Sequence, residues 1–169
     1  MTILHNYFAN EWKPNIDGFI YSGWKILDSI KDHETVLDIG CGYNLFKPHL
    51  QDRLYGIDPA NDNADEVVSI EDFTSDKKFD VLLCLGSINF GSIETIEKQI
   101  KKLVTFNKEN GRIYWRQNPG QQDHPHEGCK EIDFFKWSFD LNYYFAHKYN
   151  YRVSECKWDK KRIYSLWLK

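Results

Sequence analysis

The sequence of 169 residues contains no run of apolar residues long enough to span a bilayer, which argues against a membrane partner. Its first residues also lack the apolar stretch of a secretory signal peptide, because Asn6, Asn10 and Glu11 interrupt them. The four cysteines form no Cys-x-x-Cys pair, which argues against a disulfide framework and against a zinc knuckle. We therefore expect a cytoplasmic protein.

The chain has no large surplus of charge of either sign. Its formal net charge is −3, so the composition does not favour nucleic acid as a partner. The lysine-rich stretch at 157–162 is typical of a solvated turn. Hydrophobic residues make up 41% of the chain and aromatic residues 16%, which is enough for a sizeable core. These figures predict a single domain over residues 1–169.

Short apolar runs alternate with segments of helical period, which is typical of an α/β domain. The apolar runs predict about seven strands, over residues 35–39, 54–57, 66–70, 81–85, 112–115, 151–158 and 163–168. The helical spacing predicts helices over residues 17–30, 45–50, 92–109 and 138–149. Ser92 and Ser138 are the predicted N-caps of the last two helices, and Asn110-Gly111 is predicted to stop the helix that begins at Ser92. We expect a three-layer, doubly wound sheet that is mostly parallel and ends in an antiparallel hairpin.

Two segments fall outside these elements. Residues 1–17 form a polar and aromatic lead-in, which we interpret as a candidate lid. Residues 117–130 form a long polar loop, and loops of that length in a compact domain are often functional.

A glycine-rich loop with the pattern Asp38-x-Gly40-x-Gly42 directly follows the first predicted strand. Its glycines allow positive φ values and let a ligand approach the main chain. The dinucleotide pattern GxGxxG would need a third glycine at position 45, which is occupied by Leu45. Asp38 disfavours an anionic pyrophosphate and favours a cationic ligand. A sulfonium-containing amino acid conjugate with an ammonium group fits this charge.

Asp58 ends the second predicted strand and is followed by Pro59. Taken alone, this pair is typical of a turn. A carboxylate at this position can also accept hydrogen bonds from both hydroxyl groups of a ribose. In combination with the glycine loop, the ligand interpretation is favoured.

These motifs resemble, in order, those of class I S-adenosylmethionine-dependent methyltransferases. VLDIGCGYN resembles the glycine motif, LYGIDPA the acidic motif that follows it, and FDVLLCLGSINF the fourth-strand motif. GRIYWRQNPG resembles the fifth-strand region, and WSFDLNYYFAHKYNYRV resembles the late helix and its following strand. The resemblance implies a Rossmann-like fold, S-adenosylmethionine as cofactor and S-adenosylhomocysteine as product. Asn44 departs from the family at a position where a third small residue is common.

The resemblance also implies roles for individual residues. Asp38 is expected near the methionine moiety, with Gly40 and Gly42 beneath the cofactor. Asp58 is expected to bind the ribose, and Pro59 to pack on the adenine. The remaining residues expected to border the cofactor are Ile70, Glu71, Asp72, Leu85 and Gly86.

Methyl transfer requires alignment of nucleophile, methyl group and sulfur, and it needs a base only where the nucleophile must lose a proton. His124, His126 and Asn89 are the candidate catalytic residues, because histidine titrates near neutrality. An exposed polar loop is the alternative interpretation of the two histidines. The spacing His-x-His-x-x-Cys is not one of tetrahedral metal sites, so we expect no metal. Further candidates for the acceptor site are Tyr7, Trp12, Tyr21 and Phe90.

The sequence therefore predicts a methyltransferase that acts on an unidentified small-molecule or macromolecular acceptor, of which a small molecule is favoured. The segment after the fourth predicted strand, 86–90, lacks the Asn-Pro-Pro-Tyr motif of DNA adenine methyltransferases. A second hypothesis is a non-catalytic module that binds S-adenosylmethionine or a protein, since a compact chain leaves few residues for an acceptor pocket. A dinucleotide-dependent oxidoreductase is disfavoured by Asp38 and Leu45.

Overall fold

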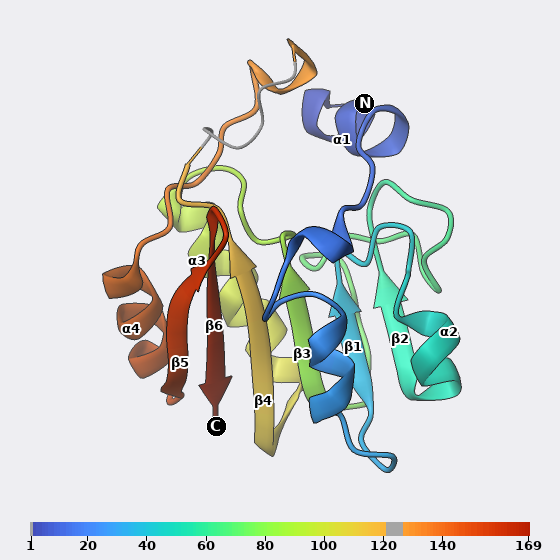
Figure 1. Cartoon of the computed structure of the whole chain (residues 1–169), viewed down its shortest axis with the longest axis vertical. Helices are drawn as coiled ribbons and strands as arrows, with labels where there is room; N and C mark the ends of the chain where they lie inside the picture. Colours follow the sequence, from blue (N-terminus) through green and yellow to red (C-terminus); the bar gives the residue numbers. More distant parts are fainter. Residues whose placement is uncertain (1, 121–126) are drawn as a thin grey trace.

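The computed structural model describes residues 2–120 and 127–169 and has an α/β fold (Figure 1). Within these residues the chain forms one sheet of six strands in the order β2-β1-β3-β4-β6-β5. The strands are β1 (Val36–Ile39), β2 (Leu54–Ile57), β3 (Phe79–Leu85), β4 (Asn107–Gln117), β5 (Arg152–Asp159) and β6 (Arg162–Leu168). Strands β2, β1, β3 and β4 are parallel, whereas β6 is antiparallel to both β4 and β5. The antiparallel hairpin is as predicted.

Helices cover both faces of the sheet. The α-helices are α1 (Ile3–Asn10), α2 (Lys47–Leu50), α3 (Ile93–Leu103) and α4 (Phe139–Lys148). Short 3₁₀ helices are η1 (Ile16–Gly18), η2 (Trp24–Ser29), η3 (Gln51–Arg53), η4 (Val104–Phe106) and η6 (Glu127–Cys129). No helix among the described residues is both long enough and apolar enough to cross a membrane.

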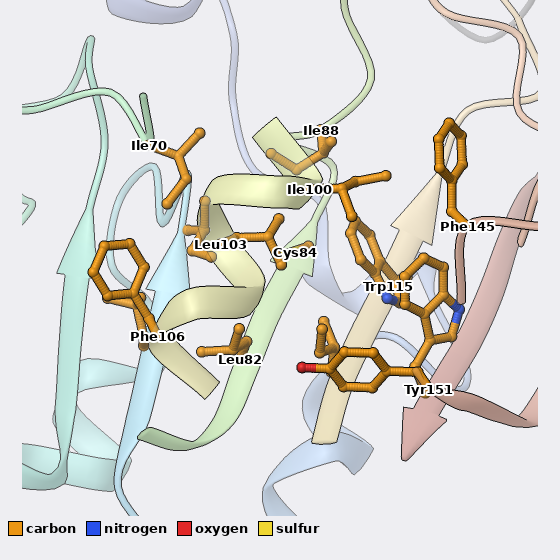
Figure 2. Close-up of a cluster of buried hydrophobic side chains, with 14 of the residues drawn as sticks. Ile70, Leu82, Cys84, Ile88, Ile100, Leu103, Phe106, Trp115, Phe145 and Tyr151 are labelled. Carbon is orange, nitrogen blue, oxygen red and sulfur yellow. The ribbon is translucent and has the colours of Figure 1, made fainter. Parts of the chain in front are cut away.

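Successive residues of the central strands face opposite sides of the sheet, so the sheet has a core on each face. Leu82 of β3 packs in the core covered by α3 and α4, and Leu83 packs in the core covered by η2 and α2. Figure 2 shows the first of these cores, where Ile100 and Leu103 of α3 lie over Leu82 and Cys84. The three-layer arrangement therefore follows from strands that are apolar on both faces.

Two predicted helix starts are confirmed by their caps. The Ser92 hydroxyl accepts a hydrogen bond from the Thr95 N–H, and the Ser138 hydroxyl accepts one from the Leu141 N–H. Each satisfies an N–H group that the first turn of a helix leaves without an internal partner.

The prediction of seven strands is wrong, because residues 66–70 form no strand. Only the first of them makes a β-bridge, to Ile57 of β2. The Gly56 N–H of β2 donates instead to the carboxylate of Asp65 at 2.8 Å. A side chain therefore occupies a position that a neighbouring strand would need, and the chain turns away at Ser69.

The predicted helix 92–109 is too long, since α3 is followed by the single turn η4 and then by β4. The Asn110-Gly111 pair lies within β4 and does not stop a helix. Asn107 accounts for the difference. Its side-chain amide donates to the Phe79 carbonyl at 3.1 Å and accepts from the Tyr151 hydroxyl at 2.9 Å, which fixes the chain in the sheet.

The predicted helix 17–30 is also wrong, because this segment forms only η1 and η2 with irregular chain between them. The buried carboxylate of Asp159 is the reason. It accepts hydrogen bonds from the consecutive N–H groups of residues 20–22, at 2.8, 3.0 and 2.8 Å. It also accepts one from the Ser22 hydroxyl at 2.8 Å. N–H groups that a helix would use internally are therefore directed at a distant side chain.

We expect Asp159→Asn to lower the free energy of unfolding at neutral pH by roughly 2–4 kcal/mol, because an amide places its own N–H groups against these donors. Burial acts to raise the pKa of Asp159, but hydrogen bonds from the Ile20 and Ser22 N–H groups outweigh it and lower the pKa. The stabilisation is therefore complete above about pH 4 and is lost as the pH falls further. Urea unfolding at neutral pH and near pH 3 measures both effects.

Asp76→Asn is the matched control, since Asp76 is exposed in the loop before β3. Its effect should stay within about 0.5 kcal/mol. Equal stability losses in the two variants would contradict the role given to Asp159.

Candidate functional site

The glycine loop lies between β1 and α2, at the carboxyl ends of the parallel strands, where open α/β sheets bind ligands. Gly40 and Gly42 have φ values of 71° and 53°. A Cβ on Gly40 would lie 2.2 Å from the Cβ of Ser87, which follows β3. The Gly40 N–H donates to the Ile57 carbonyl of β2 at 2.8 Å. Glycine at position 40 is therefore required for the close packing of three strand ends.

Asp58 follows β2, and main-chain N–H groups fix the orientation of its carboxylate. Oδ2 accepts from the Gly42 N–H at 2.9 Å, and Oδ1 accepts from the Ala60 N–H at 2.8 Å. Each carboxylate oxygen has a second lone pair, so Asp58 can accept two further hydrogen bonds from neighbouring hydroxyl groups. The glycine loop and the acidic residue, which are separate in the sequence, are thus joined by one hydrogen bond.

Asn44 is the residue that departs from the family pattern. It has a φ of 55°, a left-handed conformation that asparagine tolerates better than most side chains. Its side-chain amide donates to the Asn63 carbonyl at 3.0 Å. The departure therefore preserves the turn and ties the glycine loop to the loop after β2.

A cavity of about 1100 Å³ lies at this edge of the sheet. All of the predicted cofactor-binding residues except Asp38 line it, and they come from four separate segments of the chain. They are Gly40, Gly42, Asp58, Pro59, Ile70, Glu71, Asp72, Leu85 and Gly86. Two of them are held by neighbouring side chains. Glu71 accepts a hydrogen bond from the Gln99 amide at 2.8 Å, and Asp72 accepts one from the Ser69 hydroxyl at 2.9 Å.

Helix α1 lies beyond the carboxyl ends of the parallel strands (Figure 1). Residues of α1 and of the segment after it line the cavity. Trp12 lies so close to the glycine loop that a Cβ on Gly42 would be 2.8 Å from its indole ring. The Trp12 ring centroid is 6.0 Å from that of Tyr43. Phe8 of α1 lies 5.3 Å from Phe90, measured between ring centroids. The cavity is therefore lined on this side by aromatic rings.

Asp38 is the predicted cofactor residue that does not line the cavity; it is almost fully buried in β1. Burial raises the pKa of its carboxyl group to about 7, and the nearby charge of Asp58 adds to this. The positive charge of Arg116 acts in the opposite direction. The protonation state of the buried Asp38 carboxyl group therefore depends on the charged groups near it.

Arg116 lines the same cavity and was not singled out by the sequence analysis. Its Nη1 donates to the Ser22 carbonyl at 3.0 Å, and its Nη2 donates to the Leu85 carbonyl at 2.7 Å. The Phe19 ring lies 4.1 Å from the guanidinium carbon. The signal in the sequence is an arginine that directly follows the apolar run 113–115 of β4.

The candidates for the acceptor site fall into three groups. Tyr7, Trp12 and Phe90 line the cavity. Tyr21 packs against Tyr164 outside that lining, with ring centroids 5.8 Å apart. Candidate catalytic residues His124 and His126 lie outside the described residues.

Asn89 is fully buried and does not line the cavity. Its side-chain amide donates to the Arg116 carbonyl at 3.3 Å, and its oxygen accepts from the Asn118 N–H at 2.8 Å. The side chain therefore holds the end of β4 in place.

The sequence matches no family model and no curated protein. Its structure, however, is similar to many solved ones. One is a magnesium protoporphyrin IX methyltransferase from Synechocystis with bound S-adenosylmethionine, with a TM-score of 0.69 and 11% identity. That similarity covers 99% of this chain and 95% of the other.

A second similar structure is a 1,6-didemethyltoxoflavin-N1-methyltransferase from Burkholderia thailandensis, with its acceptor and S-adenosylhomocysteine bound. The TM-score is 0.64 at 9% identity, over 80% of this chain and 71% of that one. An N-methyltransferase from Bradyrhizobium japonicum with S-adenosylhomocysteine gives 0.63 at 11% identity, over 80% and 78%. The chain therefore has the fold of the class I S-adenosylmethionine-dependent methyltransferases.

Proposed function

We propose that the protein is an S-adenosylmethionine-dependent methyltransferase that acts on a small-molecule acceptor. The observation that carries this proposal is that one cavity at the carboxyl ends of the strands brings the predicted cofactor-binding segments together. This cavity gathers the glycine loop, the fixed carboxylate of Asp58 and the segments 70–72 and 85–86. The similar structures with bound S-adenosylmethionine or S-adenosylhomocysteine support the choice of cofactor.

The residues present fit this cofactor. Asp58 would accept hydrogen bonds from the two ribose hydroxyls, because each of its oxygens keeps a lone pair. Pro59 and the segment 70–72 would border the adenine. Asp38 would supply negative charge for the ammonium group of the methionine moiety. When bound, the cofactor supplies a methyl group on a positively charged sulfur.

The protein's part in such a reaction is to align the acceptor with that methyl group and to exclude water. Ligand pockets in proteins usually measure about 300–1000 Å³. A cavity of about 1100 Å³ can therefore hold the cofactor and a second small molecule together. This volume argues against the hypothesis that the compact chain leaves too few residues for an acceptor pocket.

The aromatic wall favours a flat, apolar acceptor. Phe8, Trp12 and Phe90 would stack on it, and residues 1–17 would act as a lid over both ligands. By its name, one of the similar proteins acts on magnesium protoporphyrin IX, and the structure of another contains 1,6-didemethyltoxoflavin. We propose His124 or His126 as the base where the acceptor must lose a proton. Asn89 would contribute as a positioning residue through Arg116 and Asn118.

We expect Asp58→Ala to weaken S-adenosylmethionine binding by about 10- to 100-fold, because the two hydrogen bonds to a charged acceptor are lost. Isothermal titration calorimetry with S-adenosylmethionine and with S-adenosylhomocysteine measures the change. Asp62→Asn, an exposed acid in the next turn, should bind like the wild type. A wild-type protein that binds neither ligand would overturn the proposed function.

The binding of S-adenosylmethionine should also depend on pH through Asp38. The ammonium group prefers the carboxylate form, so affinity is expected to rise as the pH increases from about 6 to about 7.5. Burial raises the pKa values of Cys41 and Cys84, which also face Asp38, so these thiols stay neutral over this range. Calorimetry at four pH values in this range measures how the affinity for S-adenosylmethionine changes with pH.

Asp38→Asn should bind the cofactor more weakly and without this slope. It should also be more stable than the wild type above neutral pH, by roughly 1–3 kcal/mol. The reason is that a raised folded-state pKa makes the wild type lose stability as the pH rises from about 4 to about 7. A variant that keeps the wild-type slope would show that another group titrates.

A further inference from the structure

We propose that Arg116 binds the carboxylate of the amino acid moiety of S-adenosylmethionine, opposite the ammonium group that Asp38 receives. This inference rests on the proposed function. It assigns a contact with the cofactor to a residue that lies outside the glycine and acidic motifs. Arg116 comes from the end of β4, three strand positions from β2, where Asp58 would hold the ribose.

The guanidinium group is held rigidly at the cavity wall. One nitrogen donates to the Ser22 carbonyl before η2, and another donates to the Leu85 carbonyl at the end of β3. The Phe19 ring packs on its face at 4.1 Å. Three contacts, two from the segment 19–22 and one from the end of β3, therefore fix both the position and the plane of the group.

These contacts leave hydrogen-bonding capacity toward the cavity. A guanidinium has five N–H donors, and two of them are used by the carbonyls of Ser22 and Leu85. Within residues 2–120 and 127–169, no carboxylate forms an ion pair with Arg116. The remaining N–H groups of this cavity-lining residue are therefore available to an anionic ligand.

The surroundings make a bound anion favourable. Burial lowers the pKa of Arg116 to about 10, and the charge of Arg162 acts in the same direction. Asp159 and Asp38 compensate only from a distance. A carboxylate in direct contact would offset the desolvation of the guanidinium, and guanidinium groups suit carboxylates because they can form two parallel hydrogen bonds.

The position of Arg116 favours binding of the cofactor's carboxylate over binding of a carboxylate on the acceptor. Its Nη2 reaches the end of β3, and a Cβ on Gly86 would be 3.8 Å from that nitrogen. Its charge also influences Asp38 in β1, beneath the glycine loop. Arg116 at the cavity wall and Asp38, which is buried in β1 directly before the glycine loop, would thus attract the carboxylate and the ammonium group of the methionine moiety.

The test compares S-adenosylmethionine with decarboxylated S-adenosylmethionine, which keeps the ammonium and sulfonium groups and lacks only the carboxylate. We expect the wild type to bind the complete cofactor about 10- to 100-fold more tightly. In Arg116→Met this ratio should fall to within about threefold of unity. Arg116→Lys, which keeps the charge without the forked donors, should give an intermediate ratio. Calorimetry supplies the dissociation constants, and thermal unfolding verifies that each variant is folded.

Arg152→Met is the matched control, because Arg152 is exposed on β5 at the opposite end of the sheet. It should keep the wild-type ratio. A wild type that binds both ligands equally, or an Arg116→Met that keeps the full ratio, would overturn the assignment while leaving the proposed function intact. A wild type that binds neither ligand would overturn both.

Discussion

The buried carboxylate of Asp159 holds the N-terminal segment against the sheet, and the shape of the cavity depends on it. Its four hydrogen bonds fix residues 20–22 at the turn between β5 and β6. That contact places the Ser22 carbonyl and the Phe19 ring on the guanidinium of Arg116. One charged side chain, desolvated but fully hydrogen-bonded, therefore organises a wall of the site from outside the site.

The same principle operates on the other side of the cavity. The Asp58 carboxylate binds the N–H groups of Gly42 and Ala60, and the Asp65 carboxylate binds the N–H of Gly56. Side-chain acids thereby replace main-chain partners at the end of β2. The loops at the carboxyl edge are held by a few charge-assisted hydrogen bonds, whereas apolar packing holds the sheet beneath them.

How much of this could be predicted from the sequence depends on how local each feature is. The glycine loop, Asp58 and the caps at Ser92 and Ser138 are determined within a few residues, and the sequence predicted them. The absent strand at 66–70 and the irregular segment 17–30 depend on Asp65 and Asp159, whose side chains compete with main-chain partners. Hydrophobic periodicity carries no information about such competition. Arg116 was missed for the same reason, since its setting is created by Phe19 and Ser22, about 95 residues earlier.

Asp38 and Arg116 are buried ionisable groups that lower the stability of the fold. Burial raises the pKa of the first to about 7 and lowers that of the second to about 10, so each charged form is disfavoured by its surroundings. Apolar residues at both positions would continue the cores of β1 and β4 without this penalty. Departures from local optimality of this kind concentrate at functional sites. A zwitterionic amino acid moiety would relieve both penalties at once, because its ammonium and carboxylate groups carry charges opposite to those of Asp38 and Arg116 and are attached to the same carbon atom.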